Sequence, residues 1–264
     1  MKAFVLREAA PVQEHPLELK DVPKPEPGPD ELRLRVRACG ICRTDLHVIE
    51  GDLPPARRPV IPGHQIVGVV DRVGRDVQGW EPGDRAGVAW LRGTCGQCEF
   101  CRSGRENLCE ESRYTGYHEH GGFAEYTLAP ADWTYRIPET FGDAEATPLL
   151  CAGIIGYRAL SRARVPEGGR LGLYGFGSSA HIVIQIALHR GHEVVVTTRS
   201  ESHRQLAREM GASWAGGAYE PLPEPAHSSI IFAPAGPLVP VALKSLEKGG
   251  TLSLAGIHMS PIPE

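Results

Sequence analysis

A short apolar run meets a glycine-rich turn at Arg170-Leu171-Gly172-Leu173-Tyr174-Gly175-Phe176-Gly177-Ser178-Ser179-Ala180. Residues 170–174 predict a buried strand, and the helix-length stretch 180–190 follows the turn directly. The alternation then continues, and the patterns predict strand 193–198, helix 202–210, strand 230–233, helix 239–248 and strand 251–255. Alternating strands and helices predict an α/β fold, a doubly wound parallel sheet with helices on its faces.

The first half of the chain has a different pattern. Apolar and polar residues alternate over 31–38, which predicts a strand with one face in water and Arg33 on that face. A second β-branched stretch covers 66–73, and turns rich in Gly and Pro separate such segments. The pattern predicts a barrel-like β domain over 1–150, followed by the α/β domain over 151–264.

Composition excludes some classes of partner. The 264 residues carry a net charge of −4, with 41% hydrophobic and 23% charged residues, which is ordinary for a globular protein. This charge gives no reason to expect nucleic acid or an anionic membrane as a partner. No apolar run approaches the roughly 20 residues of a membrane span. The start of the chain does not have the pattern of a secretory signal, so we expect a cytoplasmic protein.

The cysteines are clustered. Four of the seven, Cys95, Cys98, Cys101 and Cys109, lie in the pattern C-x2-C-x2-C-x7-C, and an odd total argues against a disulfide framework. Tetrahedral zinc prefers such thiolate sets, and a site with four protein ligands has no open position. We therefore expect a structural zinc lobe at about residues 92–112.

Three other interpretations of this lobe are weaker. An iron–sulfur cluster usually has different spacing and a Pro after its last cysteine, where this chain has Glu110. Unligated thiols are a second alternative. A zinc ribbon that binds nucleic acid would need a basic face, but here acidic residues offset the basic ones.

Several motifs, taken together, resemble one family. They are Cys39-Gly40-Ile41-Cys42-Arg43-Thr44-Asp45-Leu46-His47, Pro62-Gly63-His64-Gln65, the four-cysteine lobe, Trp80-Glu81-Pro82-Gly83-Asp84-Arg85, Gly121-Gly122-Phe123-Ala124-Glu125-Tyr126 and Cys151-Ala152-Gly153. In this order they resemble the zinc-dependent medium-chain alcohol dehydrogenases. The resemblance implies a GroES-like catalytic domain over 1–150 and a Rossmann domain over 151–264. It also implies a missing last strand and C-terminal return, hence an incomplete chain, and a homodimer or homotetramer for the full-length form.

The resemblance also implies a catalytic zinc ion bound by Cys42, His64 and Cys151. Such a site binds the alcohol oxygen as an alkoxide at its open position. A lone buried cysteine is the alternative for Cys151, and Cys39 is interpreted as a core thiol. The family often has Gly-His-Glu where this chain has Gly63-His64-Gln65, so any exchange of ligands that needs a carboxylate is in doubt.

Further residues match family roles. Asp45 resembles the carboxylate that orients the histidine ligand. Thr44 resembles the hydroxyl that takes the substrate proton, and His47 the imidazole that passes this proton to solvent. Arg43 matches a residue facing the cofactor pyrophosphate, and Trp90 matches a wall of the alcohol pocket. Alternatively, His47 is a solvated loop histidine, Arg43 is a surface arginine and Trp90 is a core tryptophan.

The glycine-rich turn fits a dinucleotide cofactor. Gly175, Gly177, Ser178 and Ala180 belong to a G-x-G-x-x-A pattern in which the glycines admit the pyrophosphate and the small last residue allows helix packing. The next strand ends at Thr198 without a carboxylate, and Arg199 and Arg204 follow. Cations there favour a 2′-phosphate, so we expect NADP(H) rather than NAD(H). Alternatively, these two arginines only solvate a helix start.

The sequence therefore predicts an enzyme that interconverts a small alcohol and an aldehyde or ketone with a nicotinamide cofactor and two zinc ions per chain. A polyol or aryl-alcohol dehydrogenase of the same architecture is a rival. A non-catalytic cofactor-binding or scaffold relative, or an inactive fragment, would keep only the structural zinc ion. Zinc-independent quinone or enoyl reduction fits poorly, because the family resemblance gives those enzymes neither zinc site.

Overall fold

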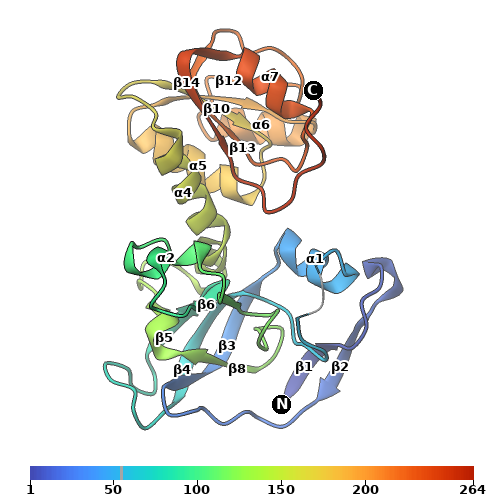
Figure 1. Ribbon diagram of the computed structural model, residues 1–264, viewed down its shortest axis with the longest axis vertical. Helices are drawn as coiled ribbons and strands as arrows, with labels where there is room; N and C mark the ends of the chain where they lie inside the picture. Colours follow the sequence, from blue (N-terminus) through green and yellow to red (C-terminus); the bar gives the residue numbers. More distant parts are fainter. Residues whose placement is uncertain (54–55) are drawn as a thin grey trace. The chain divides into compact units, whose positions relative to one another are not determined.

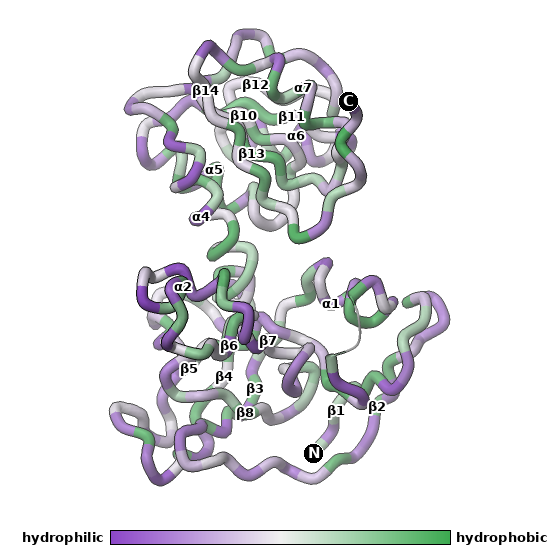
Figure 2. Tube along the Cα trace, viewed as in Figure 1, coloured by the Kyte–Doolittle hydropathy of each residue, from purple (hydrophilic) through white to green (hydrophobic). Residues whose placement is uncertain are grey.

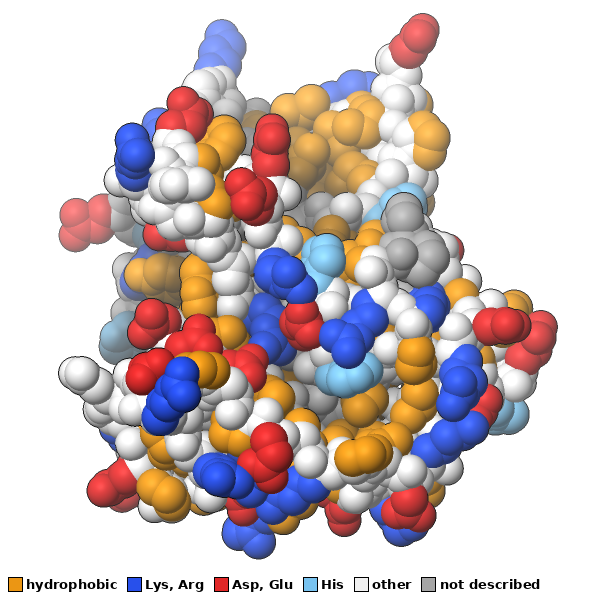
Figure 3. Space-filling model, turned by 60° about the horizontal axis from the view of Figure 1, so that its bottom comes forward, with side chains coloured by type: hydrophobic (Ala, Val, Ile, Leu, Met, Phe, Trp, Pro, Cys, Tyr) orange, Lys and Arg blue, Asp and Glu red, His pale blue; other side chains and the backbone are white. Residues whose placement is uncertain are grey.

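Two five-stranded sheets organise the chain, one in each of its two units, Met1–Cys151 and Ala152–Glu264 (Figure 1). The computed structural model describes residues 1–53 and 56–264. No helix among them is both long and apolar enough to cross a membrane. On the face shown in Figure 3, acidic and basic side chains are interspersed.

The first unit is built on an antiparallel sheet. Its order is β8-β3-β4-β5-β9, with β3 at Glu31–Gly40, β4 at Gln65–Val73, β5 at Arg85–Val88, β8 at Tyr126–Pro130 and β9 at Thr134–Arg136. Around it lie the pair β1 (Lys2–Leu6) and β2 (Leu17–Asp21), the pair β6 (Leu91–Gly93) and β7 (Arg113–Tyr114), and helices α1 (Arg43–Glu50), α2 (Glu99–Arg102) and α3 (Asp143–Ala146). The predicted β-rich half is confirmed.

One detail of β3 differs from the prediction. Leu32 and Leu34 are fully buried, as their alternation requires, but Arg33 between them is also only 8% exposed. Its guanidinium donates to Asp71 at 2.6 Å and to Glu26 at 2.9 Å. Because these carboxylates replace water as partners, the prediction that Arg33 faces solvent was wrong.

The second unit is a parallel sheet in the order β12-β11-β10-β13-β14. Its strands are β10 (Arg170–Tyr174), β11 (Glu193–Thr197), β12 (Trp214–Gly216), β13 (Ala226–Ile231) and β14 (Leu246–Leu254), and its helices are α4 (Ala152–Ala163), α5 (Ser178–His189), α6 (Glu201–Glu209) and α7 (Leu238–Lys244). Figure 2 shows the hydrophobic character of β10, β11 and β13. The order places a topological switch between β10 and β13, where such sheets bind ligands.

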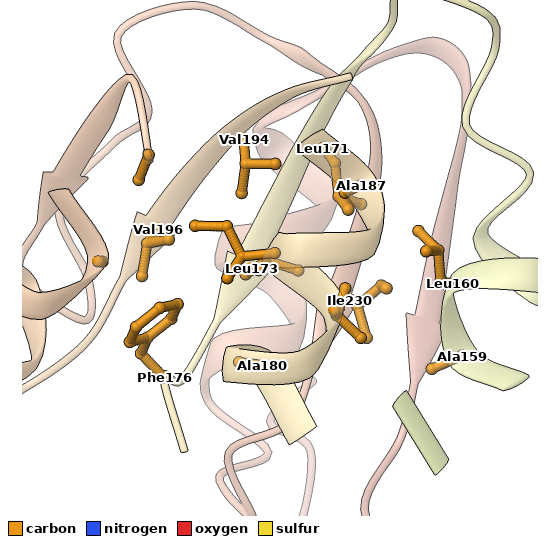
Figure 4. Close-up of a cluster of buried hydrophobic side chains, with 14 of the residues drawn as sticks. Ala159, Leu160, Leu171, Leu173, Phe176, Ala180, Ala187, Val194, Val196 and Ile230 are labelled. Atoms are coloured by element: carbon orange, nitrogen blue, oxygen red, sulfur yellow. The ribbon is translucent and has the colours of Figure 1, made fainter. Parts of the chain in front are cut away.

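Side chains alternate across this sheet and bury both of its faces. Leu173 and Ile230 pack with residues of α4, α5 and α6, whereas Tyr174 and Ile231 pack with α7 (Figure 4 shows the first cluster). Each fully buried aliphatic side chain contributes roughly 1.5–3 kcal/mol. Helices therefore cover both faces, and the predicted doubly wound arrangement is confirmed.

The predicted helix over 239–248 is too long. Helix α7 ends at Lys244, and β14 already begins at Leu246. Residues 249 and 250, interpreted as helix stops, lie inside this strand, where the pairing with β13 shifts register between Ala226 and Ser228. The pairing with a central strand satisfies more backbone groups than another helical turn would, so tertiary structure overrides the local pattern.

Candidate metal centres and a dinucleotide-binding turn

The four cysteines of the predicted lobe lie between β6 and β7. Helix α2 is a single turn with Cys98 at its N-cap, and backbone N–H groups point at the sulfurs. The N–H of Cys98 donates to the Sγ of Cys95 at 3.4 Å, and that of Cys101 donates to the Sγ of Cys98 at 3.5 Å. Amides of Gln97 and Cys98 lower the pKa of Cys95 to about 7. The local backbone therefore favours a thiolate at Cys95, whereas at Cys98 the backbone N–H of Cys101 is outweighed by burial and by the sulfurs of Cys101 and Cys95, which raise the pKa of Cys98 to about 11.

The sulfur separations fit a tetrahedral zinc ion. Thiolates about 2.3 Å from such an ion lie about 3.8 Å from one another. The Sγ of Cys95 lies 3.9 Å from that of Cys101 and 3.6 Å from that of Cys109, and the Sγ atoms of Cys98 and Cys101 are 3.4 Å apart. All four ligand atoms lie within 4.8 Å of one another.

A second cluster combines Cys42, His64 and Cys151. The Sγ atoms of Cys42 and Cys151 are 3.9 Å apart, and the Nε2 of His64 lies 3.4 Å from the Sγ of Cys151. Two sulfurs and one nitrogen on a tetrahedral zinc ion would be about 3.6–3.8 Å apart, so the residues fit the ion. Among residues 1–53 and 56–264, this cluster and the cysteine lobe are the two groups of at least three potential ligands that could hold a metal.

Three separate elements deliver these side chains. Cys42 is the N-cap of α1, His64 lies in the turn before β4, and Cys151 follows the 3-10 turn Thr147–Leu150. The turn requires glycine at position 63, where φ is +94° and a Cβ would lie 2.6 Å from Phe123 and 2.9 Å from the sulfur of Cys39. Burial raises the pKa of Cys39 to about 12, which suits a packed thiol outside the cluster.

Asp45 ties two of these elements together and is only 2% exposed. Its Oδ1 lies 2.8 Å from the Nδ1 of His64, and its Oδ2 accepts the backbone N–H of Cys42 at 2.8 Å. With the Nδ1–H donated to Asp45, the lone pair of Nε2 points toward the sulfurs. Burial lowers the pKa of His64, but hydrogen bonds with Asp45 and Cys42 outweigh it and raise the pKa to about 9. The Asp45 carboxylate therefore makes the Nε2 of His64 a more basic metal ligand.

The two thiols of the second cluster have opposite pKa shifts, because a thiol beside a thiolate can donate a hydrogen bond to it. A hydrogen bond from Cys151 lowers the pKa of Cys42 to about 3, and the same contact, together with burial, raises the pKa of Cys151. Two buried thiolates at this distance repel each other unless a cation lies between them. The donor chemistry, like the geometry, therefore fits a divalent ion such as zinc.

The other predicted residues of this unit lie on α1 and beside the cluster. Thr44 is buried in the first turn of α1, Arg43 is exposed before it, and the Nδ1 of His47 lies 2.7 Å from the Oδ2 of Asp52. The ring centroid of Trp90 lies 4.8 Å from that of His64.

Sequence reasoning missed the stack behind Trp90. Its ring lies 4.9 Å from that of Tyr114 and 6.0 Å from that of Tyr117, both nearly parallel to it. The cluster of aromatic residues at 114–118 was the available signal.

Gln65, at the start of β4, is 4% exposed, and its Nε2 lies 3.0 Å from where a Cβ on Gly40 would be.

In the second unit, the glycine-rich turn joins β10 to α5. Gly175 has φ of +90°, and a Cβ there would lie 2.9 Å from the backbone nitrogen of Ala233. Gly177 is the N-cap of α5 and is exposed with Ser178, with open space where its Cβ would be. Ala180 is fully buried against the sheet. The N-terminus of α5 therefore presents backbone N–H groups that can bind a phosphate.

The end of β11 carries no carboxylate. Thr198 is 7% exposed and Arg199 beside it is exposed. The guanidinium of Arg204 donates to the carbonyl oxygens of Thr198 and Arg199, each at 3.0 Å, and pairs with Glu201. Arg204 thus holds the loop together, and Arg199 is the more accessible cation at the strand end.

Comparisons with known proteins agree with this arrangement. A family model described as "Alcohol dehydrogenase GroES-like domain" matches residues 28–139. The chain is 51% identical over 269 residues to "Probable alcohol dehydrogenase AdhA" of Mycobacterium tuberculosis, across 100% of this chain and 78% of the relative.

Solved structures are also similar. A Sinorhizobium meliloti protein described as a zinc-binding dehydrogenase, solved with NADP, shares 29% identity at a TM-score of 0.89, over 100% of this chain and 79% of that one. An acetophenone reductase from Geotrichum candidum, solved with NAD, shares 30% identity at a TM-score of 0.83, over 95% and 74% of the two chains. Both nicotinamide cofactors therefore occur among similar structures.

Proposed function

Because the chain belongs to the zinc-dependent medium-chain alcohol dehydrogenases, we propose that it interconverts a small alcohol and its aldehyde or ketone with NADP(H), using a zinc ion bound by Cys42, His64 and Cys151. Family membership supports the coarser statement, an alcohol oxidoreductase that uses a nicotinamide cofactor. The observation that carries the finer proposal is the convergence of two sulfurs and one imidazole nitrogen at tetrahedral spacing.

Three protein ligands leave a fourth position for the substrate oxygen. A zinc ion held by this trio would supply Lewis acidity, which lowers the pKa of an alcohol hydroxyl and polarises a carbonyl. Asp45 keeps the Nδ1 proton of His64 in place, so the Nε2 lone pair stays available as a ligand. Trp90, beside His64, forms an apolar wall that excludes water from the substrate carbon.

Thr44 and His47 are proposed to move the proton. The hydroxyl of Thr44 accepts the substrate proton during oxidation and gives its own to the relay. His47 passes the proton to solvent, and both steps reverse during reduction. A bound nicotinamide cofactor would supply the acceptor or donor of the hydride. In the second unit, the N–H groups at the start of α5 are proposed to bind the pyrophosphate of the cofactor.

The four-cysteine lobe is proposed to hold a second, structural zinc ion. Its four thiolates leave no position for substrate, so its contribution is to folding. The proposal therefore requires two zinc ions per chain. Elemental analysis of the purified protein, together with assays of alcohol oxidation, tests it. One zinc ion per chain and no turnover of any alcohol would support the scaffold alternative instead.

Cofactor preference is proposed to depend on Arg199. Arg199 is exposed and directly follows Thr198, where an NAD-specific site would carry a carboxylate. A lost hydrogen bond to a charged group costs about 1.5–3 kcal/mol, so Arg199→Ala is expected to reduce kcat/KM for NADP(H) at least about tenfold and to leave that for NAD(H) nearly unchanged.

The control for this substitution is Arg190→Ala. Arg190 is the C-cap of α5, and its guanidinium lies over the ring of Tyr157. Arg190→Ala should leave the ratio of the two cofactors unchanged. Equal kcat/KM values for NADP(H) and NAD(H) in the unaltered protein would reject the preference, while the alcohol dehydrogenase assignment would stand.

A further inference from the structure

Asp52 lies against the histidine proposed to carry the proton. Its Oδ2 is 2.7 Å from the Nδ1 of His47. The His47 side chain is 13% exposed and that of Asp52 is 60% exposed, so solvent reaches the pair mainly at the carboxylate. None of the sequence motifs included Asp52.

The end of α1 explains why these side chains meet. The helix ends at Glu50, and Gly51 caps it in the left-handed conformation with φ of +86°. The N–H groups of Gly51 and Leu53 both donate to the carbonyl oxygen of His47, at 3.1 and 3.3 Å. These two bonds fold the chain back over the last turn of α1, and Asp52, between the two donors, reaches the imidazole.

We propose that Asp52 is a positioning residue for His47, and the proposal rests on the relay function proposed above. The carboxylate accepts the Nδ1–H of His47, which fixes the tautomer that carries its lone pair on Nε2. Only Nε2 can then take up a proton.

The proton balance is simple. During alcohol oxidation, Nε2 accepts the proton that left the substrate hydroxyl and then releases it to water. The Nδ1 proton stays on His47 throughout and is not transferred to Asp52. During carbonyl reduction, Nε2 takes a proton from water and donates it inward.

The first test uses nuclear magnetic resonance rather than turnover. In protein with 15N-labelled histidine, at a pH where the imidazole is neutral, His47 is expected to be the Nδ1–H tautomer. Its signal is identified by its loss in His47→Gln. In Asp52→Asn the new amide can donate to Nδ1, which favours the Nε2–H tautomer. An Nε2–H tautomer in the unaltered protein, or one that Asp52→Asn leaves unchanged, would overturn the proposal.

The second test is a double-mutant cycle on proton release during the first turnover of alcohol oxidation. His47→Gln should slow this step about a hundredfold, which is the lower end for general acid–base catalysis. Asp52→Asn should slow it roughly tenfold, and Asp52→Glu should recover most of the rate. In the His47→Gln background, Asp52→Asn should have no further effect, because the group it positions is gone.

Glu50→Gln is the matched control. It removes one negative charge from the same helix end, but the Glu50 carboxylate accepts the N–H of Val12 rather than a proton of His47. A tenfold effect of Glu50→Gln as well would show that charge alone acts, and would reject the positioning role. An unchanged rate in His47→Gln would reject the relay itself and this proposal with it, while the zinc and cofactor assignments stand.

Discussion

Sulfur atoms gather twice in the first unit, and the two clusters are built in opposite ways. The lobe takes its four cysteines from one short segment between β6 and β7. The other cluster joins Cys42 to Cys151, which are 109 positions apart in the chain, and adds His64 from a third segment. A closed set of four ligands can only hold a metal in place, whereas three ligands leave a position for chemistry.

The support of the two clusters differs as well. In the lobe, the sulfurs of Cys95, Cys98 and Cys109 each accept a backbone N–H from within the same short segment. The second cluster depends on Asp45, whose two oxygens hold His64 and the backbone of Cys42. The four cysteines of the lobe can come together as soon as their own loop folds. Cys42, His64 and Cys151 come together only when the sheet of the first unit has formed.

The largest effect is expected from Cys151→Ser, because it removes one of the three proposed ligands of the catalytic zinc ion. Loss of Lewis acid stabilisation worth several kcal/mol predicts a fall in kcat/KM of about a thousandfold or more. Zinc content should fall from two ions to one per chain, and the circular dichroism spectrum should be retained. Enzyme assays and elemental analysis check this prediction.

Cys39→Ala is the matched control for Cys151→Ser. It removes another buried thiol of the same region that touches Gly63 but lies outside the ligand cluster. Two zinc ions and a kcat within a few-fold of the unaltered protein are expected. If Cys151→Ser kept both zinc ions and its activity, the contrast between an open and a closed site would be wrong.

An intermediate effect is expected from Asp45→Asn. The amide can still bond to Nδ1 but supplies no charge, and it can favour the wrong tautomer of His64. Loss of such a partner typically costs 10–100-fold in metal affinity or activity, so zinc competition assays should show a shift of about this size at one site only. Asp132→Asn, an exposed carboxylate before β9, should shift neither site. A shift at the lobe would mean that the two clusters share their support.

The same contrast explains what could be predicted from sequence. The spacing of Cys95, Cys98, Cys101 and Cys109 identified a cluster because a short loop can close on an ion without the rest of the fold. Alternation of strands and helices predicted the parallel sheet for a similar, local reason. Cys42, His64 and Cys151 came only from the family resemblance, because nothing in their own spacing brings three distant segments together.

The misses are tertiary effects. Arg33 is buried because Asp71 and Glu26 come from elsewhere to pair with it. The helix predicted over 239–248 gave way to β14 because β13 offered a pairing partner. The contact between His47 and Asp52 depends on a left-handed cap whose geometry the glycine at position 51 suggests but does not determine.

The smallest effect on turnover is expected from Cys98→Ser in the closed lobe. Removal of one thiolate should release the structural zinc ion, lower the midpoint of thermal unfolding and make residues 92–112 sensitive to protease, because metal binding there is folding free energy. The ligands of the open site come from other elements, so kcat should change by less than about threefold, as expected for distant sites. Because Trp90 stacks on Tyr114 of β7, a loosened lobe would displace Trp90 and raise KM instead.

Cys98→His keeps four ligands and should restore two zinc ions and the unfolding midpoint. Loss of both zinc ions in Cys98→Ser would show that the two clusters fold as one. The lobe would then not form its zinc site independently, although its four cysteines lie in one short segment.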